Sequence, residues 1–177
     1  TARGATVGVV GGAIAGDAGK GAAVGAAMAG FRPIADLMFA DFMYVAADEV
    51  LLTAASWRFI HGGKLNLPCV IYASIGGYAR LGSDHSQCPE AIVLHSPGLK
   101  FVVPSTPYDA KGLLKAAIRD DDPVIFIEHK LLYMTKGEVP EEEYIVRLGQ
   151  AEIKRAGEDI TVVTYSYMTL KCLEAAE

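Results

Sequence analysis

The sequence predicts an α/β fold: a mostly parallel sheet with helices on both faces, plus the start of a second α/β domain. Two observations predict it. Short runs rich in β-branched residues alternate with longer segments of helical period, which is typical of βαβ units. A chain of 177 residues also has room for one complete hydrophobic core.

The first expected element is a long helix from about Asp41 to His61, where apolar residues recur at three- and four-residue spacing before Gly62-Gly63 ends it. An unbroken apolar run from Leu67 to Ala73 then predicts a buried strand. The glycine-punctuated segment from Ser74 to Gln87 has neither period. Because connections of this length in compact domains often bind ligands, we expect a functional loop here.

The alternation continues in the second half of the chain. The run from Lys100 to Pro104 predicts a strand, and Thr106 with the proline after it predicts the start of a helix that ends near Arg119. The residues from Val124 to Glu128 predict another buried strand. This stretch is therefore expected to add a strand, a helix and a strand to the first domain.

A domain boundary is expected near Tyr144. The acidic, proline-containing stretch from Lys136 to Tyr144 is typical of a solvated connector. We expect residues 1–144 to form the first domain and residues 145–177 to form a connector and the truncated start of a C-terminal domain. In the latter, Asp159 to Tyr165 predicts a strand and Met168 to Glu177 predicts a helix.

Composition excludes several classes of protein. The chain is 51% hydrophobic and 21% charged with a net charge of -5, which disfavours nucleic acid and anionic membranes as partners. Its 3 cysteines lack the spacing of a zinc site, so we expect no metal on this chain and a reducing compartment. The apolar stretch from Ala22 to Gly30 is too short to span a bilayer, and no signal-peptide pattern precedes it. These features predict a cytoplasmic protein.

The stretch from Val7 to Gly16 suggests one candidate site, because a β-like run followed by a glycine turn and an Ala-rich segment is typical of dinucleotide-binding folds. The fingerprint G-x-G-x-x-G is incomplete, since Ala13 stands where its middle glycine is required. Asp36 follows at the distance expected of a ribose ligand. A module that binds NAD or FAD is therefore retained as an alternative hypothesis.

Among the 4 histidines, His85 is the best candidate for proton transfer. It lies in the long loop, flanked by Asp84, Ser86 and Gln87, all of which can orient an imidazole. The aromatic pair Phe39 and Phe42 is interpreted by default as core packing.

Five segments carry a resemblance to a known family: GAAVGAAMAGFRPI at residues 21–34, FADF at 39–42, DHSQ at 84–87, PGLKFVVPSTPYDAKGLLKAAIRDDDPVIFIEHK at 97–130 and GEVPEEEY at 137–144. From Gly21 to Glu177 the chain resembles the β subunit of the E1 component of pyruvate, branched-chain 2-oxo acid and acetoin dehydrogenases. These proteins are members of the transketolase-like group. The segments EHKLLY and GEVPEEEY favour the acetoin type over the pyruvate type.

The resemblance implies a domain that holds the aminopyrimidine of thiamin diphosphate. It also implies that a partner α subunit, in an α2β2 heterotetramer, holds the diphosphate and Mg²⁺. The protein is then an oxidoreductase subunit that acts on a 2-oxo acid or acetoin and passes an acyl group to a lipoyl group on the E2 acyltransferase.

The same resemblance assigns residues. Phe42 matches the position whose ring stacks on the aminopyrimidine, and His85 matches the histidine that faces the substrate and the lipoyl arm. It also implies a K⁺ ion held by backbone carbonyls in the turn from Ala117 to Asp122.

The sequence departs from the family at one position that matters for catalysis. The family has Pro-Ile-Ser-Glu before the glycine that matches Gly21, and this glutamate contacts the pyrimidine N1′. An alignment without gaps places Gly16 at the position of the glutamate, with Asp17 beside it. Three explanations stay open: Asp17 substitutes as a cofactor-binding residue, the chain is a non-catalytic remnant, or residues 1–20 do not represent the native chain. We favour the third, because only this opening differs from the family.

Overall fold

The computed structural model describes residues 17–177, with side chains from Gly21 onward, and it shows a four-stranded sheet in the order β1-β2-β4-β3. The strands are β1 (Ile34–Phe39), β2 (Val70–Ile75), β3 (Lys100–Val102) and β4 (Val124–His129). Every neighbouring pair of strands is parallel. The predicted α/β class is therefore confirmed.

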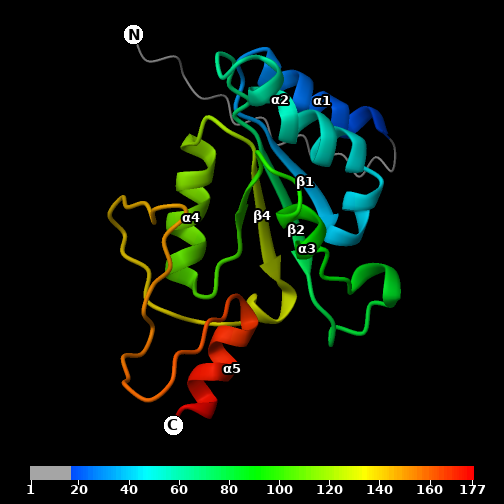
Figure 1. Cartoon of the computed structure of the whole chain (residues 1–177). Helices are drawn as coiled ribbons and strands as arrows, with labels where there is room; N and C mark the ends of the chain where they lie inside the picture. The colour runs from blue at the N-terminus through cyan, green and yellow to red at the C-terminus, as the bar shows by residue number, and fades with distance from the viewer. Residues whose placement is uncertain (1–16) are drawn as a thin grey trace.

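Helices cover both faces of the sheet (Figure 1). One face is covered by three elements that contribute apolar residues to a common core cluster: α1 (Asp17–Met28), the π-helical segment η2 (Asp48–Ala54) and α3 (Glu90–Leu94). Helix α2 (Ala55–Ile60) continues η2. On the other face, α4 (Pro107–Arg119) packs on a second cluster. In this part of the chain, no helix is long and apolar enough to cross a membrane.

Strand β4 shows why its sequence is an unbroken apolar run. Ile125 and Ile127 belong to the cluster under α1 and η2, whereas Val124 and Phe126 belong to the cluster under α4. All four side chains are completely buried. A strand covered on both faces needs apolar residues at successive positions, and each such side chain contributes about 1.5–3 kcal/mol through burial.

Helix α4 has the boundaries that the sequence predicts. Thr106 forms a capping box with Asp109, each side chain bonding the backbone N–H of the other residue at 3.1 Å. Pro107 occupies the first helical position, where its missing N–H costs nothing. At the other end, Arg119 pairs with Glu143 of the connector.

Two parts of the predicted fold differ at the N-terminal side. Strand β1 was not predicted, and the helix expected from Asp41 to His61 is divided into the 3-10 helix η1 (Ala40–Tyr44), η2 and α2. Apolar spacing of three and four residues does not distinguish α, 3-10 and π windings. The chain must turn sharply where β1 ends, and the tight η1 turn buries Asp41 and Met43 there.

The strand predicted from Asp159 to Tyr165 is wrong. Its apolar residues are exposed, Val163 by 91% and Ile160 by 80%, and the segment has no ladder partner among the described residues. Without a neighbouring strand, an extended apolar run gains neither hydrogen bonds nor burial. The helix expected after it is present as α5 (Tyr167–Ala175), and the boundary near Tyr144 stays a prediction.

Candidate functional site

The candidate site lies at the carboxyl edge of the sheet. Because β1, β2 and β4 are parallel, their last residues, Phe39, Ile75 and His129, meet at one edge. Loop 76–89 and the short 3-10 helix η4 (Lys130–Leu132) both start from this edge (Figure 1). Open α/β sheets bind their ligands outside the carboxyl ends of the strands.

A bulge in β1 sets the direction of Phe39. The register with β2 shifts between Asp36 and Phe39, and Met38 has a φ of 65°, in the left-handed region. Two side chains hold this conformation: Asp36 Oδ1 accepts from the Met38 N–H at 2.7 Å, and Ser74 Oγ donates to the Met38 carbonyl at 2.8 Å. Bulges of this kind redirect side chains next to functional sites.

Phe39, Phe42 and His85 form an aromatic cluster at this edge. The His85 ring lies 4.3 Å from the Phe39 ring and 5.5 Å from the Phe42 ring, centroid to centroid, and both contacts are edge-to-face. Phe39 and Phe42 are themselves 6.0 Å apart. The structure thus brings together Phe42 and His85, which the sequence placed 43 positions apart in separate elements. Both are partly buried.

The polar atoms of the cluster are only partly satisfied. His85 Nδ1 lies 3.2 Å from Asp84 Oδ1 but in a geometry that makes no hydrogen bond, and it is buried. The imidazole holds the pKa of the exposed Asp84 carboxyl below its ordinary value. Asp41 is 7% exposed; its Oδ1 accepts from the Gln87 N–H at 3.3 Å, and its buried Oδ2 has no partner among the described residues.

Of the three loop neighbours expected to orient His85, only Asp84 approaches the ring. Ser86 Oγ donates to the Gly82 carbonyl at 2.7 Å, and Gln87 contacts Asp41 through its backbone. Sequence reasoning missed Asp41 and Lys130 as parts of the site. Both lie in segments quoted for the resemblance, FADF and EHK, but a buried carboxylate and a lysine have no local pattern that assigns them to one edge.

A second polar group lies on the α4 face of β2 and β4. The Tyr72 hydroxyl donates to Glu128 Oε2 at 2.5 Å, and burial raises the pKa of Tyr72. Glu128 and Tyr133 line a small cavity of about 190 Å³ with residues at the start of α4. The aromatic cluster belongs to neither this cavity nor this face, so we keep the two groups separate.

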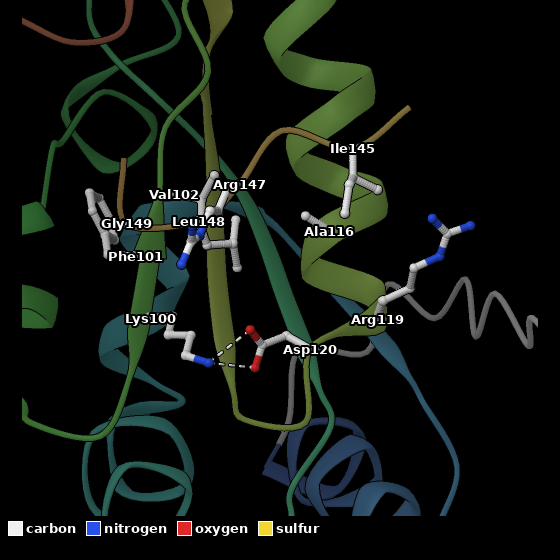
Figure 2. Close-up of a pocket in the computed structure, with 10 residues that line it drawn as sticks. All are labelled: Lys100, Phe101, Val102, Ala116, Arg119, Asp120, Ile145, Arg147, Leu148 and Gly149. Atoms are coloured by element: carbon white, nitrogen blue, oxygen red, sulfur yellow. Dashed lines mark hydrogen bonds and ion pairs between the residues drawn. The ribbon is translucent and has the colours of Figure 1, made fainter. Parts of the chain in front are cut away.

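A larger hollow of about 500 Å³ lies between β3, α4 and residues 145–149 (Figure 2). Two of its charged groups are paired with each other: Lys100 Nζ donates to both oxygens of Asp120, at 2.7 and 2.8 Å. Figure 2 shows Arg119 extending away from this pair. The hollow includes the first residues of β3 and the end of α4 and lies away from the carboxyl edge, so its size does not identify the functional site.

The turn expected to hold K⁺ does not fit that ion as it is arranged. Arg32 Nη1 donates to the carbonyls of Ile118 and Asp120, at 3.2 and 2.7 Å, and its other nitrogen pairs with Asp121. A guanidinium therefore already provides positive charge to these carbonyls. Elsewhere in residues 17–177, no group of three His, Cys, Asp or Glu side chains could hold a metal ion.

The remaining sequence candidates lie partly outside the described residues. The stretch from Val7 to Gly16 is outside them, and Asp17 is described only as the first residue of α1, without its side chain. Asp36, the residue considered for a ribose, uses Oδ1 on the Met38 N–H in the β1 bulge. The dinucleotide hypothesis thus gains no support from this edge.

Comparison with known proteins identifies the family of the chain. Residues 13–136 match the family described as the pyrimidine-binding domain of transketolase. The chain is 54% identical to the β subunit of acetoin:2,6-dichlorophenolindophenol oxidoreductase of Cupriavidus necator, over 88% of this chain and 46% of that protein. It is 50% identical to the 2-oxoisovalerate dehydrogenase β subunit of Bacillus subtilis, over 89% of this chain and 48% of that protein.

Solved structures agree with the sequence comparison. A split-gene transketolase, described as an inactive β4 tetramer, matches with a TM-score of 0.68 at 25% identity, over 92% of this chain and 49% of that one. The chain thus spans about half the length of the relatives it matches. With its parallel sheet and the match over residues 13–136, the chain belongs to the family of transketolase pyrimidine-binding domains.

Proposed function

We propose that this chain is the pyrimidine-binding part of the β subunit of a thiamin-diphosphate-dependent E1 dehydrogenase of the acetoin or 2-oxo acid type. One observation supports it most: the partly buried cluster of Phe39, Phe42 and His85 lies at the carboxyl edge of the sheet with buried polar atoms left unpartnered. Apolar walls with a few unsatisfied polar atoms are what a site for an aromatic heterocycle requires.

Individual roles follow from this proposal. The Phe42 ring stacks on the aminopyrimidine, and Phe39 packs behind it and helps to exclude water. His85 faces the substrate and, with Asp84 3.2 Å from its Nδ1, is placed to hold or move a proton. Asp17, at the start of α1, is the acid that this sequence offers near the position of the missing glutamate.

Thiamin diphosphate supplies an electron sink for carbon-carbon bond cleavage when it is bound. An α subunit is proposed to bind Mg²⁺ and the diphosphate, as the resemblance to E1 β subunits implies. The name of the split-gene relative describes its β4 form as inactive. We infer that this chain works in an α2β2 assembly and passes its acyl group to a lipoyl-bearing E2 protein.

The proposal also covers the organisation of the chain. Residues 1–144 form the pyrimidine-binding domain, and residues 145–177 form the connector and the start of a C-terminal domain. The family match ends at residue 136, before this boundary, and α5 follows a long stretch without strands. These two observations support the division.

Binding is the first test, because the position of the missing glutamate affects turnover more than it affects binding. The chain is co-expressed with an α subunit of the acetoin type, and thiamin diphosphate with Mg²⁺ is titrated by calorimetry. Phe42→Ala is expected to weaken binding by about 2–10-fold, the value of one aromatic contact. Phe59→Ala, which removes a phenylalanine that is 87% exposed, is the matched control and leaves binding unchanged.

Turnover is measured on the same assembly with acetoin, pyruvate or 2-oxoisovalerate and a dye as electron acceptor. Loss of a proton-transferring side chain in His85→Ala is expected to lower kcat by about 100-fold or more. Tight cofactor binding without turnover on any of the three would identify a non-catalytic remnant. A thermal shift with NAD or FAD, and none with thiamin diphosphate, would instead establish the dinucleotide-binding alternative.

A further inference from the structure

Two side chains from other elements hold the backbone that directly follows the His85 side chain. Lys130 Nζ, from η4, donates to the His85 carbonyl at 2.7 Å. Asp41 Oδ1, from η1, accepts from the Gln87 N–H at 3.3 Å. One contact follows β4 and the other follows β1, so the histidine loop is tied to the ends of two strands of the sheet.

The position of Lys130 is unusual for a surface lysine. Its ammonium lies 5.2 Å from the centroid of the Phe39 ring, a cation–π arrangement, and the side chain is partly buried. Burial lowers the pKa of Lys130, and the charges of Asp41 and Cys88 offset part of that effect. Among the described residues no carboxylate lies within ion-pair distance of it. The partly buried Lys130 cation therefore contacts the His85 backbone and the face of the Phe39 ring.

Asp41 complements Lys130. Its carboxylate is 7% exposed and reaches the loop two residues beyond His85. A buried carboxylate that accepts only one hydrogen bond in the described structure is costly to keep, since desolvation penalises the charge. Its contribution here is to fix the Gln87 amide while attracting the Lys130 ammonium through their opposite charges.

We propose that Lys130 and Asp41 are positioning residues that clamp the backbone of residues 85–87 and so hold the His85 imidazole against Phe39 and Phe42. The inference deepens the proposed function and rests on it for its catalytic meaning. Its structural content, however, concerns one loop and can be measured without turnover. Neither residue touches the substrate in this account; both act through His85.

The test is amide hydrogen exchange on the full 177-residue chain. Lys130→Met keeps an unbranched side chain, one atom shorter, but removes its donors. We expect exchange in residues 84–88 to rise by about tenfold or more. Exchange in β2 and β4 stays unchanged. Lys130→Arg restores slow exchange, because a guanidinium also donates to a carbonyl. Lys136→Met, a change at an exposed connector lysine, is the matched control.

Asp41 is tested in the same way. Asp41→Asn keeps an acceptor for the Gln87 N–H and is expected to preserve slow exchange, whereas Asp41→Ala removes the acceptor and speeds exchange at residues 84–88. If Asp41→Ala fails to fold, Asp41→Asn serves as the readout. Fast exchange at residues 84–88 in Asp41→Asn, while the strands stay protected, contradicts the clamp. Unchanged loop exchange in Lys130→Met overturns the proposal, and so does equal loss of protection across the sheet.

In the assembled enzyme, the same variants separate positioning from catalysis. Lys130→Met is expected to lower kcat about tenfold and shift its pH profile, with KM within about threefold, and Lys130→Arg restores both. A kcat and pH profile equal to those of the unmodified enzyme would refute the positioning role. If no assembly turns over any substrate, the proposed function fails, while the exchange experiment still decides whether the clamp exists.

Discussion

Replacing Gly76 by alanine is expected to disturb the carboxyl edge more than any change of the same size nearby. Gly76 has a φ of 97°, where an L-residue is strained by about 1–3 kcal/mol. A Cβ built on Gly76 would lie 2.1 Å from Nε2 of His129, so the ring must move by more than an ångström. Overpacking of this kind costs a further amount of about 1–3 kcal/mol. We therefore expect a total loss of about 3 kcal/mol.

The displaced ring has two further contacts to lose. His129 Nδ1 accepts from the Leu131 N–H at 3.2 Å, and the ring stacks on Tyr167 with centroids 5.1 Å apart. With a urea dependence of about 2 kcal/mol per molar, a loss of about 3 kcal/mol lowers the unfolding midpoint by about 1.5 M. Gly77→Ala is the control, since a Cβ there meets nothing within 4 Å. Equal midpoints for Gly76→Ala and Gly77→Ala would refute the close approach of His129.

Four other sets of substitutions test separate parts of the chain. Met38 has a left-handed φ of 65°, so Met38→Gly should leave the free energy of unfolding unchanged or raise it by about 1 kcal/mol. Met38→Val should lower it, because this conformation disfavours a β-branched residue. Urea melts of the two variants give the sign. Thr106→Ala removes the α4 cap and should lower the free energy of unfolding by about 1 kcal/mol. Thr106→Ser keeps a capping hydroxyl and should retain most of that stability in the same assay. A loss from Thr106→Ser as large as that from Thr106→Ala would contradict the cap. Burial and the charge of Lys130 lower the pKa of His129 from its ordinary 6.5. As the pH falls, the His129 imidazole is therefore protonated in the unfolded chain before it is protonated in the folded one, so the free energy of unfolding should fall below about pH 6.5. His129→Asn should flatten this part of a pH–stability curve. Gly16→Glu places an acid at the position that aligns without gaps with the family's glutamate. If the opening residues are authentic, it should raise kcat of the assembled enzyme by about 100-fold. If Asp17 acts in place of that glutamate, Asp17→Asn should lower the activity of the unmodified chain.

The elements that local chemistry determines could be predicted from the sequence. Helix α4 has its hydroxyl cap and its proline at the first turn, and β4 begins with four successive apolar residues that are buried on both faces of the sheet. Phe42 and His85 became candidates through a family resemblance and an unusually long loop. Their proximity follows from the parallel order of the strands, since residues that follow β1 and β2 must emerge at one edge.

The parts that depend on distant neighbours could not be predicted. Strand β1 was missed because a bulge and a left-handed Met38 interrupt its alternation, and only Asp36 and Ser74 together stabilise that shape. The strand expected from Asp159 to Tyr165 was wrong because an apolar run does not specify a partner. Lys130 and Asp41 acquire their role from contacts across 45 and 46 residues of sequence.

Those sequence separations also bear on the order of folding. Joining the histidine loop to the strand ends requires closing long segments of chain, and the entropy of closure is lost before the contacts form. We expect the loop to dock after β1, β2 and β4 have assembled, because its tethers Asp41 and Lys130 directly follow β1 and β4 and are placed by those strands. Changes to its two tethers should speed unfolding while leaving the folding rate nearly constant. The loop can thus vary in sequence and still fold, because the scaffold it docks on forms without it.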